Sequence, residues 1–110
     1  MENSENVVIF ITAGTDEEAQ EIAKALLKSR DAACVNIVHG ISSLFWWNDK
    51  LDSAQESLLI VKSKASLLRE IVTLVKEVHS YENPEIIAIP IIDGNPDYLD
   101  WIGKEVKKDT

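Results

Sequence analysis

His79-Ser80-Tyr81-Glu82-Asn83-Pro84-Glu85 separates an amphipathic helix pattern over residues 67–78 from an almost wholly apolar strand pattern over residues 85–92. An imidazole, a phenol and two carboxylates are therefore crowded into the junction between two packed elements, where functional residues are often found. Pro84 keeps Asn83 away from the helical region, so we expect the junction to hold one shape.

The N-terminal part of the chain predicts one strand followed by one helix. Residues 7–11 are β-branched and apolar without alternation, which is typical of a strand covered on both faces. Thr15, followed by three acidic residues, forms a capping-box pattern at the start of a helix. The apolar stripe of this helix comprises Ala19, Ile22, Ala23, Leu26 and Leu27.

The middle of the chain predicts a long hairpin. Residues 33–38 form one strand, which continues over residues 41–47 after a bulge or bend at Gly40. Asn48-Asp49-Lys50 is the expected turn, because Asn and Asp tolerate left-handed backbone conformations. The chain then returns along residues 51–61.

The C-terminal part predicts a helix, a strand and a final helix. We expect Ser63 to cap the first of these helices. Pro90 lies within the strand expected at residues 85–92 and favours an edge position or a bulge, because proline donates no ladder hydrogen bond. Asn95-Pro96-Asp97 is a helix-start pattern.

This order, β-α-β-β-α-β-α, predicts an α+β, ferredoxin-like sandwich with an extended hairpin and an added C-terminal helix. With 110 residues, 45% of them hydrophobic, the chain forms one domain over residues 1–110, beginning with a polar tail at residues 1–6. Two helices cover only one face of a four-stranded sheet, yet residues 7–11, 58–61 and 86–92 are apolar on both faces. We infer that other subunits cover the second face.

Charge and cysteine usage narrow the function classes. The net charge of -8 disfavours binding to nucleic acid or to anionic lipid. The apolar run at residues 7–11 is too short to insert into a membrane. Cys34 is the single cysteine, which excludes an internal disulfide and fits a reducing compartment, so we expect the cytoplasm.

Five motifs, in order, resemble the CutA divalent-cation-tolerance family. They are Ala33-Cys34-Val35-Asn36-Ile37; Ser43-Leu44-Phe45-Trp46-Trp47 with Lys50; Glu56 ahead of Leu59-Ile60-Val61-Lys62; His79-Ser80-Tyr81-Glu82-Asn83-Pro84-Glu85-Ile86-Ile87; and Tyr98-Leu99-Asp100-Trp101-Ile102. The resemblance implies a homotrimer of ferredoxin-like subunits, similar to PII signalling proteins, with a role in divalent-metal tolerance and copper binding. Two positions depart from the family: Ser80 replaces the usual proline, and Asp49 replaces the usual turn glycine.

The candidate metal ligands for Cu²⁺ or another divalent ion are Cys34, His79, Glu82 and Glu85. A thiolate selects Cu(I) or Zn, whereas imidazole with carboxylates suits borderline divalent metals. The alternatives are that Cys34 is a small buried hydrophobe and that His79 caps its helix. Strand parity places Cys34 and His39 on opposite faces, so a shared site would need ligands from several subunits.

A second candidate site is a polar pocket. Glu56 and Lys62 share one strand face and, with His79, Tyr81 and Trp47, would line a cleft between subunits. The alternative is a salt bridge at the interface. We expect the trimer interface to include the large apolar residues of the hairpin and two later positions, namely Phe45, Trp46, Trp47, Pro90 and Trp101. The alternative is that the hairpin aromatics stack on a ligand.

The sequence lacks a Gly-rich phosphate loop, HExxH, paired CxxC and G-x-S-x-G, so it favours binding over catalysis. Three functions remain open. The first is a homotrimer that binds copper or another divalent metal, the second is a PII-like sensor of a small anion, and the third is a structural module that docks a partner through its hairpin.

Overall fold

The computed structural model describes residues 5–108 and arranges them in the predicted order of elements. These are β1 (Asn6–Ala13), α1 (Asp16–Lys28), β2 (Cys34–Trp47), β3 (Lys50–Lys64), the 3-10 turn η2 (Ala65–Leu67), α2 (Leu68–Val78), β4 (Ile86–Pro90) and α3 (Pro96–Glu105). Asn6 belongs to β1, so the polar tail is shorter than expected, and residues 1–4 of that tail lie outside the described part of the chain. Among residues 5–108, no helix is long and apolar enough to cross a bilayer.

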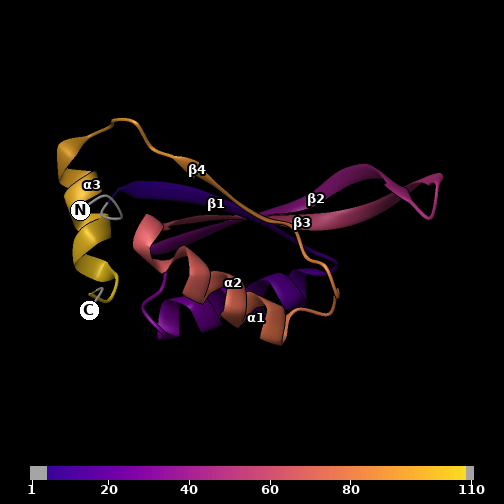
Figure 1. Cartoon of the computed structure of the whole chain (residues 1–110), viewed down its shortest axis with the longest axis horizontal. Coiled ribbons are helices and arrows are strands. Elements are labelled where there is room, and N and C mark those ends of the chain that lie inside the picture. The colour runs from indigo at the N-terminus through magenta and orange to yellow at the C-terminus, as the bar shows by residue number, and fades with distance from the viewer. Residues whose placement is uncertain (1–4, 109–110) are drawn as a thin grey trace.

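The four strands form one antiparallel sheet in the order β2-β3-β1-β4 (Figure 1). The predicted edge position of Pro90 is confirmed, because β4 pairs only with β1. The expectation that this strand runs over residues 85–92 is wrong at both ends. Val7 pairs with Pro90, so β1 has too few residues left to pair with Ile92.

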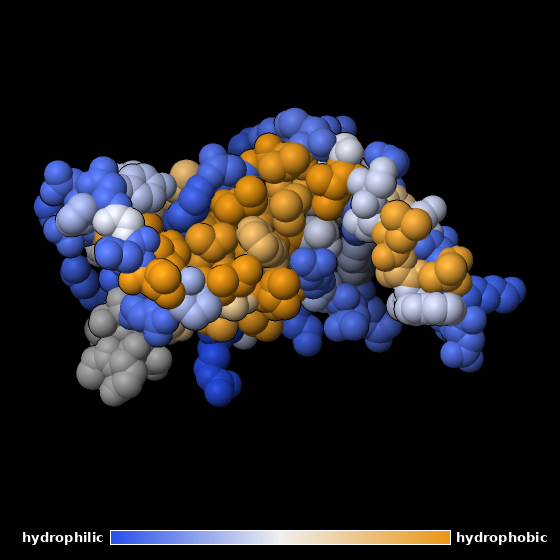
Figure 2. All heavy atoms as spheres, turned by 90° about the horizontal axis from the view of Figure 1, so that it is seen from above, coloured by the Kyte–Doolittle hydropathy of each residue, from blue (hydrophilic) through white to orange (hydrophobic). Residues whose placement is uncertain are grey.

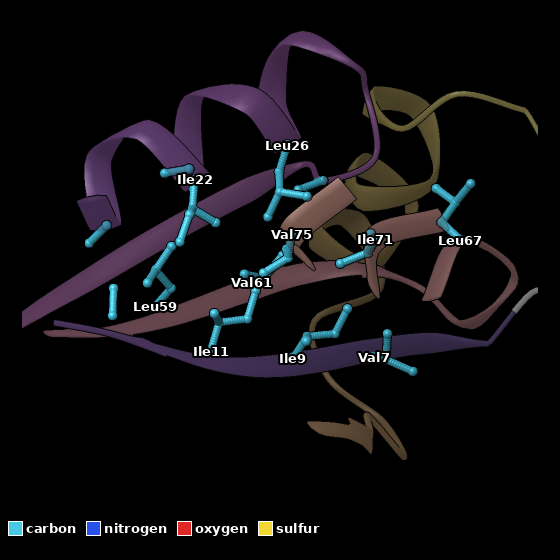
Figure 3. Packing of buried hydrophobic residues seen from close by; sticks show 14 of the residues in the cluster. Val7, Ile9, Ile11, Ile22, Leu26, Leu59, Val61, Leu67, Ile71 and Val75 are labelled. Carbon is cyan, nitrogen blue, oxygen red and sulfur yellow. The ribbon is translucent and has the colours of Figure 1, made fainter. Parts of the chain in front are cut away.

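The hydrophobic core lies between one face of the sheet and the pair of helices α1 and α2 (Figure 3). Alternate residues of the two central strands point toward these helices and are almost fully buried. Burying one such aliphatic side chain contributes about 1.5–3 kcal/mol. The largest fully buried aliphatic side chains of the sheet and the helices are Ile9, Ile11, Ile22, Leu26, Leu59, Ile71, Ile102, Val61 and Val75.

The opposite face of the sheet is apolar, and none of the helices within residues 5–108 covers its centre (Figure 2). Phe10 on β1 pairs with Ile87 on one side and with Ile60 on the other, so these side chains share this face. Ile87 and Ile89 are 50% and 45% exposed. This surface, made of Val8, Phe10, Leu58, Ile60, Ile87 and Ile89, is called the open face below.

The β2–β3 hairpin extends well beyond the helices and gives the molecule a length of 43 Å (Figure 1). The predicted irregularity at Gly40 is confirmed by a register shift between Val38 and Ile41 and by a positive φ at Gly40. The turn contains only Asn48 and Asp49, both with positive φ, because Lys50 already pairs with Trp47. Two successive left-handed residues are what a two-residue hairpin turn of type I′ requires.

The prediction that Ser63 caps a helix is wrong. Ser63 is buried within β3, and its hydroxyl donates to the carbonyl of Asp31. Pairing between β1 and β3 extends as far as Asn6 and Lys64, so the sheet holds the chain extended past the local cap signal. The helix begins only after η2. The terminal cap is confirmed, since the side chain of Asn95 accepts from the amide of Asp97 at 3.1 Å.

Candidate functional site

His79 lies at the end of α2 and is anchored to β1. Its ring Nε2 is 2.7 Å from the carbonyl oxygen of Thr12, and its Nδ1 is 3.0 Å from the amide of Tyr81. A carbonyl only accepts and an amide only donates, so Nε2 carries the proton and Nδ1 accepts. The His79 side chain is fully buried, both ring nitrogens are hydrogen-bonded, and Nδ1 also lies 3.6 Å from the Glu18 carboxylate. Its ring bonds to β1 and not to the carbonyls of its own helix.

Glu18 on α1 holds the residue that follows His79. Its carboxylate accepts from the amide of Ser80 at 2.5 Å, from the hydroxyl of Ser80 at 3.1 Å and from the amide of Gly14 at 3.3 Å. Burial alone would raise the pKa of Glu18, but the hydrogen bonds from Ser80, with smaller contributions from His79 and Gly14, lower it below its usual value. Sequence reasoning assigned Glu18 only to a capping box and missed this role.

Tyr81 connects the loop to β3. Its hydroxyl donates to the carboxylate of Glu56 at 2.8 Å, and its ring lies against that of His79 with centroids 4.7 Å apart. Burial and then the neighbouring Glu56 carboxylate raise the pKa of Tyr81 to about 12. Gly14 lies next to the Tyr81 ring, since a Cβ added at position 14 would be 3.1 Å from the Tyr81 hydroxyl oxygen. His79, Tyr81 and Glu56 therefore form one hydrogen-bonded cluster with Glu18.

Cys34 lies toward the other end of the sheet. It is half-buried on β2 and pairs with Lys62 of β3, and its sulfur is 4.0 Å from the Lys62 ammonium. Lys62 in turn pairs with Val8, four residues along β1 from Thr12, which contacts His79. At roughly 3.3 Å per residue, these two positions are offset by about 13 Å along β1, and Cys34 lies a further two strands across the sheet. Burial, followed by the adjacent Cys34, raises the pKa of Tyr98 on α3, which lies beside the sulfur.

The predicted metal ligands are not assembled within one chain. Glu82 and Glu85 are exposed. No group of three or more His, Cys, Asp or Glu side chains in residues 5–108 is placed to hold an ion. The two nitrogens of His79 are already hydrogen-bonded, so ligation would break one of those bonds. The side chains that the structure describes in one chain therefore do not form a preformed metal centre.

The predicted pocket is assembled only in part. Glu56 meets His79 through Tyr81, whereas Lys62 bonds to Asn36 and lies near Cys34, so Glu56 and Lys62 have different partners. Trp47 lies at the tip of the hairpin and is 62% exposed. His39 does not join Cys34, because its Nδ1 is 2.7 Å from Asp16 on the helix side of the sheet.

The residues expected at a trimer interface all lie on the surface of the single chain. On the hairpin, Phe45 is 37% exposed, Trp46 is 71% exposed and Trp47 is 62% exposed. Pro90 is exposed on the edge strand. Trp101 is 38% exposed and packs on Tyr98, with ring centroids 5.4 Å apart. None of them belongs to the core of the isolated subunit.

Comparison with known proteins gives consistent matches along nearly the whole chain. A family model described as CutA1 divalent ion tolerance protein matches residues 7–105. The divalent-cation tolerance protein CutA of Archaeoglobus fulgidus is 48% identical over 99 residues, which cover 90% of this chain and 96% of the relative. The chloroplastic protein CutA 1 of Oryza sativa subsp. japonica is 39% identical over 103 residues, which cover 94% of this chain but 58% of the relative.

A solved structure of the divalent cation tolerance protein (Cut A1) from Thermus thermophilus superimposes with a TM-score of 0.91. The two sequences are 42% identical, and the match covers 93% of this chain and 99% of the other. The fold, the order of elements and the sequence therefore agree. The chain belongs to the CutA1 divalent ion tolerance protein family.

Proposed function

We propose that this protein is a homotrimer that binds a divalent metal ion, with copper as the leading candidate, and that it contributes to tolerance of such ions. Family membership supports the general role, since relatives are described as divalent-cation tolerance proteins. The observation that carries the assembly is the open face, where Ile87 and Ile89 stand half-exposed in the single chain. An apolar surface of this kind is typical of a subunit interface.

The candidate ligands support a metal site shared between subunits. Cys34 supplies a soft sulfur at one end of the sheet, while Glu82 and Glu85 supply carboxylates near the other end. Sulfur and carboxylate together suit copper or zinc better than magnesium or calcium. Because one chain holds these groups apart, a site that uses both kinds would take Cys34 from one subunit and the loop carboxylates from another. His79 would join only by giving up a hydrogen bond.

Calorimetric titration of the intact protein with Cu(I), Cu(II) and Zn(II) tests this proposal. We expect saturable binding that weakens in Cys34→Ser and in Glu82→Gln/Glu85→Gln. Glu77→Gln, an exposed acidic residue on α2, serves as the charge-matched control and should bind like the parent. An affinity no tighter than about millimolar, the weak end of the binding scale, would exclude the metal-binding function.

A second candidate is a PII-like sensor that binds a small anion between subunits. The observation in its favour is the cluster of His79, Tyr81 and Glu56, to which a neighbouring subunit would add the ammonium of Lys62. The carboxylate of Glu56 opposes an anion at this point, so the metal proposal ranks first. Melting temperatures measured with nucleotides and dicarboxylates distinguish the two functions. A sensor of small anions should show a ligand-dependent rise in melting temperature that persists in the presence of a chelator and is lost in Lys62→Ala.

A third candidate is a structural module that docks a partner through its hairpin. Trp46 and Leu51 near the hairpin turn are each 71% exposed. Affinity capture with the intact protein and with residues 44–50 shortened tests this function, provided that the shortened form keeps its oligomeric state. We also propose a cytoplasmic location, on the basis of the single cysteine, and cell fractionation tests it.

A further inference from the structure

We propose that Glu18 is a positioning residue that holds the loop of residues 79–85 in place by accepting hydrogen bonds from Ser80. This inference rests on the proposed function, in which the same loop contributes Glu82 and Glu85 to a shared metal site. Glu18 lies on the first turn of α1, 62 residues before Ser80 in the sequence. It is therefore a component of the site supplied by a different element of the fold.

The contact uses every donor that Ser80 has. The amide and the hydroxyl of Ser80 both donate to the Glu18 carboxylate, at 2.5 and 3.1 Å. The same carboxylate accepts from the amide of Gly14, so it also ties the loop to the end of β1. The Glu18 side chain is only 14% exposed. Hydrogen bonds to an ionised group are about twice as strong as neutral ones, and they are less screened when the group is shielded from water.

The position of Ser80 determines how the rest of the loop leaves α2. His79 before it is fixed by Thr12, and Tyr81 after it is fixed by both His79 and Glu56. Ser80 lies between these two anchors and has no such contact to β1 or β3 among the described residues. Without Glu18, the two anchors would be joined by a residue free to change its backbone angles. We therefore expect the loss of Glu18 to loosen Tyr81 and the residues that follow it.

The backbone at His79 offers an independent way to restore the loop. His79 has φ -85° and ψ 142°, which is the extended conformation that a residue preceding proline adopts. Ser80→Pro therefore introduces no conflict at residue 79. This variant removes both donors to Glu18 but fixes φ at residue 80 by its ring. It supplies rigidity that no longer depends on the Glu18 carboxylate.

Amide hydrogen exchange of Tyr81 in the intact protein, measured by NMR, tests the proposal. Glu18→Gln should speed exchange of this amide about tenfold, the effect of about 1.4 kcal/mol lost in local hydrogen bonding. Glu17→Gln, the exposed neighbour on the same helical turn, should leave it unchanged. In the Ser80→Pro background, Glu18→Gln should add no further acceleration. Unchanged exchange in Glu18→Gln, or an equal effect in both backgrounds, would overturn the proposal.

Copper titration separates this inference from the proposed function. If the loop supplies ligands, Glu18→Gln should weaken Cu(II) affinity several-fold, and Glu18→Gln/Ser80→Pro should recover it. Full Cu(II) affinity in Glu18→Gln, despite faster Tyr81 exchange, would overturn the positioning role. If the unmodified protein binds no copper, the proposed function fails, whereas the exchange experiment still decides whether Glu18 holds the loop.

Discussion

The hydroxyl of Tyr81 donates a 2.8 Å hydrogen bond to the carboxylate of Glu56 and so joins the loop after α2 to β3. Glu56 is buried, and Tyr81 is its hydrogen-bond donor among the described side chains. Tyr81→Phe would leave this carboxylate without that donor and should lower the free energy of unfolding by about 1–3 kcal/mol. Urea titration at fixed protein concentration measures this. Tyr98→Phe, at a 40% exposed position, should cost less.

The pH dependence of stability provides a check on the same contact. Burial and Glu56 raise the pKa of Tyr81 to about 12 from its ordinary value of 10.0, so the folded state holds this proton more tightly. The stabilisation is fully present below pH 10 and is lost as the pH rises through about 12. Tyr81→Phe should remove this alkaline contribution. If the variant keeps the parent's stability at neutral pH and its alkaline profile, the contact contributes nothing.

Glu18 should govern part of the acid sensitivity. Although burial opposes it, the hydrogen bonds from Ser80 lower the pKa of Glu18, so the folded state binds this proton more weakly than the unfolded state. Its stabilisation is present above the unfolded pKa and is lost as the pH falls through the lower folded value. Glu18→Gln should therefore destabilise the protein near neutral pH and flatten the acid side of the stability profile. Urea midpoints across the acid range, with Glu17→Gln as the control, measure the effect.

The hairpin turn should be improved by glycine at position 49. Asn48 and Asp49 have φ of 51° and 63°, and glycine adopts this left-handed conformation without a steric penalty. Asp49→Gly should raise the free energy of unfolding by about 0.5–1 kcal/mol, whereas Asp49→Ala should lower it. Chemical denaturation of the three proteins in parallel measures both changes. A loss of stability in Asp49→Gly would mean that the Asp49 side chain makes a contribution of its own.

Lys107 should stabilise a buried carboxylate near the end of α3. Asp31 is 1% exposed, and its Oδ1 lies 3.0 Å from the Lys107 ammonium, which also contacts Glu70 on α2. Lys107→Met would leave Asp31 without this cation and should cost about 1–3 kcal/mol, at the lower end because Lys107 is one-third exposed. Thermal and urea unfolding measure the loss. Lys108→Met, an exposed neighbour, should change stability little.

Local signals predicted much of the fold. The apolar stripe of α1, the positive-φ turn at Asn48 and Asp49, and the edge position of Pro90 follow from residue types and their spacing. Leu27 is the exception in the predicted stripe, because it lies at its margin and is 40% exposed. Ser63 shows where such signals fail. Its cap pattern is local, but the ladder between β1 and β3 continues past it, and sheet pairing outweighs a single cap.

The candidate site was predictable only where its residues are neighbours in the chain. The junction containing His79 and Tyr81 is visible in the sequence as a polar break between two apolar patterns. Its contacts with Thr12 and Glu18 join residues 67 and 62 positions apart. They depend on how α2 lies over the sheet, which no local pattern encodes. The separation of Cys34 from His79 likewise depends on strand register.

We expect copies of this chain to cover the open face in the proposed assembly. Ile87→Asp places a charge on that face at a half-exposed position, so it should destabilise the assembly without affecting the core. Leu27→Asp, at a similarly exposed position on α1, is the matched control and should leave the assembly intact.

Sedimentation velocity at low protein concentration measures the assembly most directly. We expect a trimer for the unmodified protein and for Leu27→Asp, and smaller species for Ile87→Asp. A well-folded monomer of the unmodified protein would contradict the account, because the open face would then be stable in water and no site could be shared between subunits.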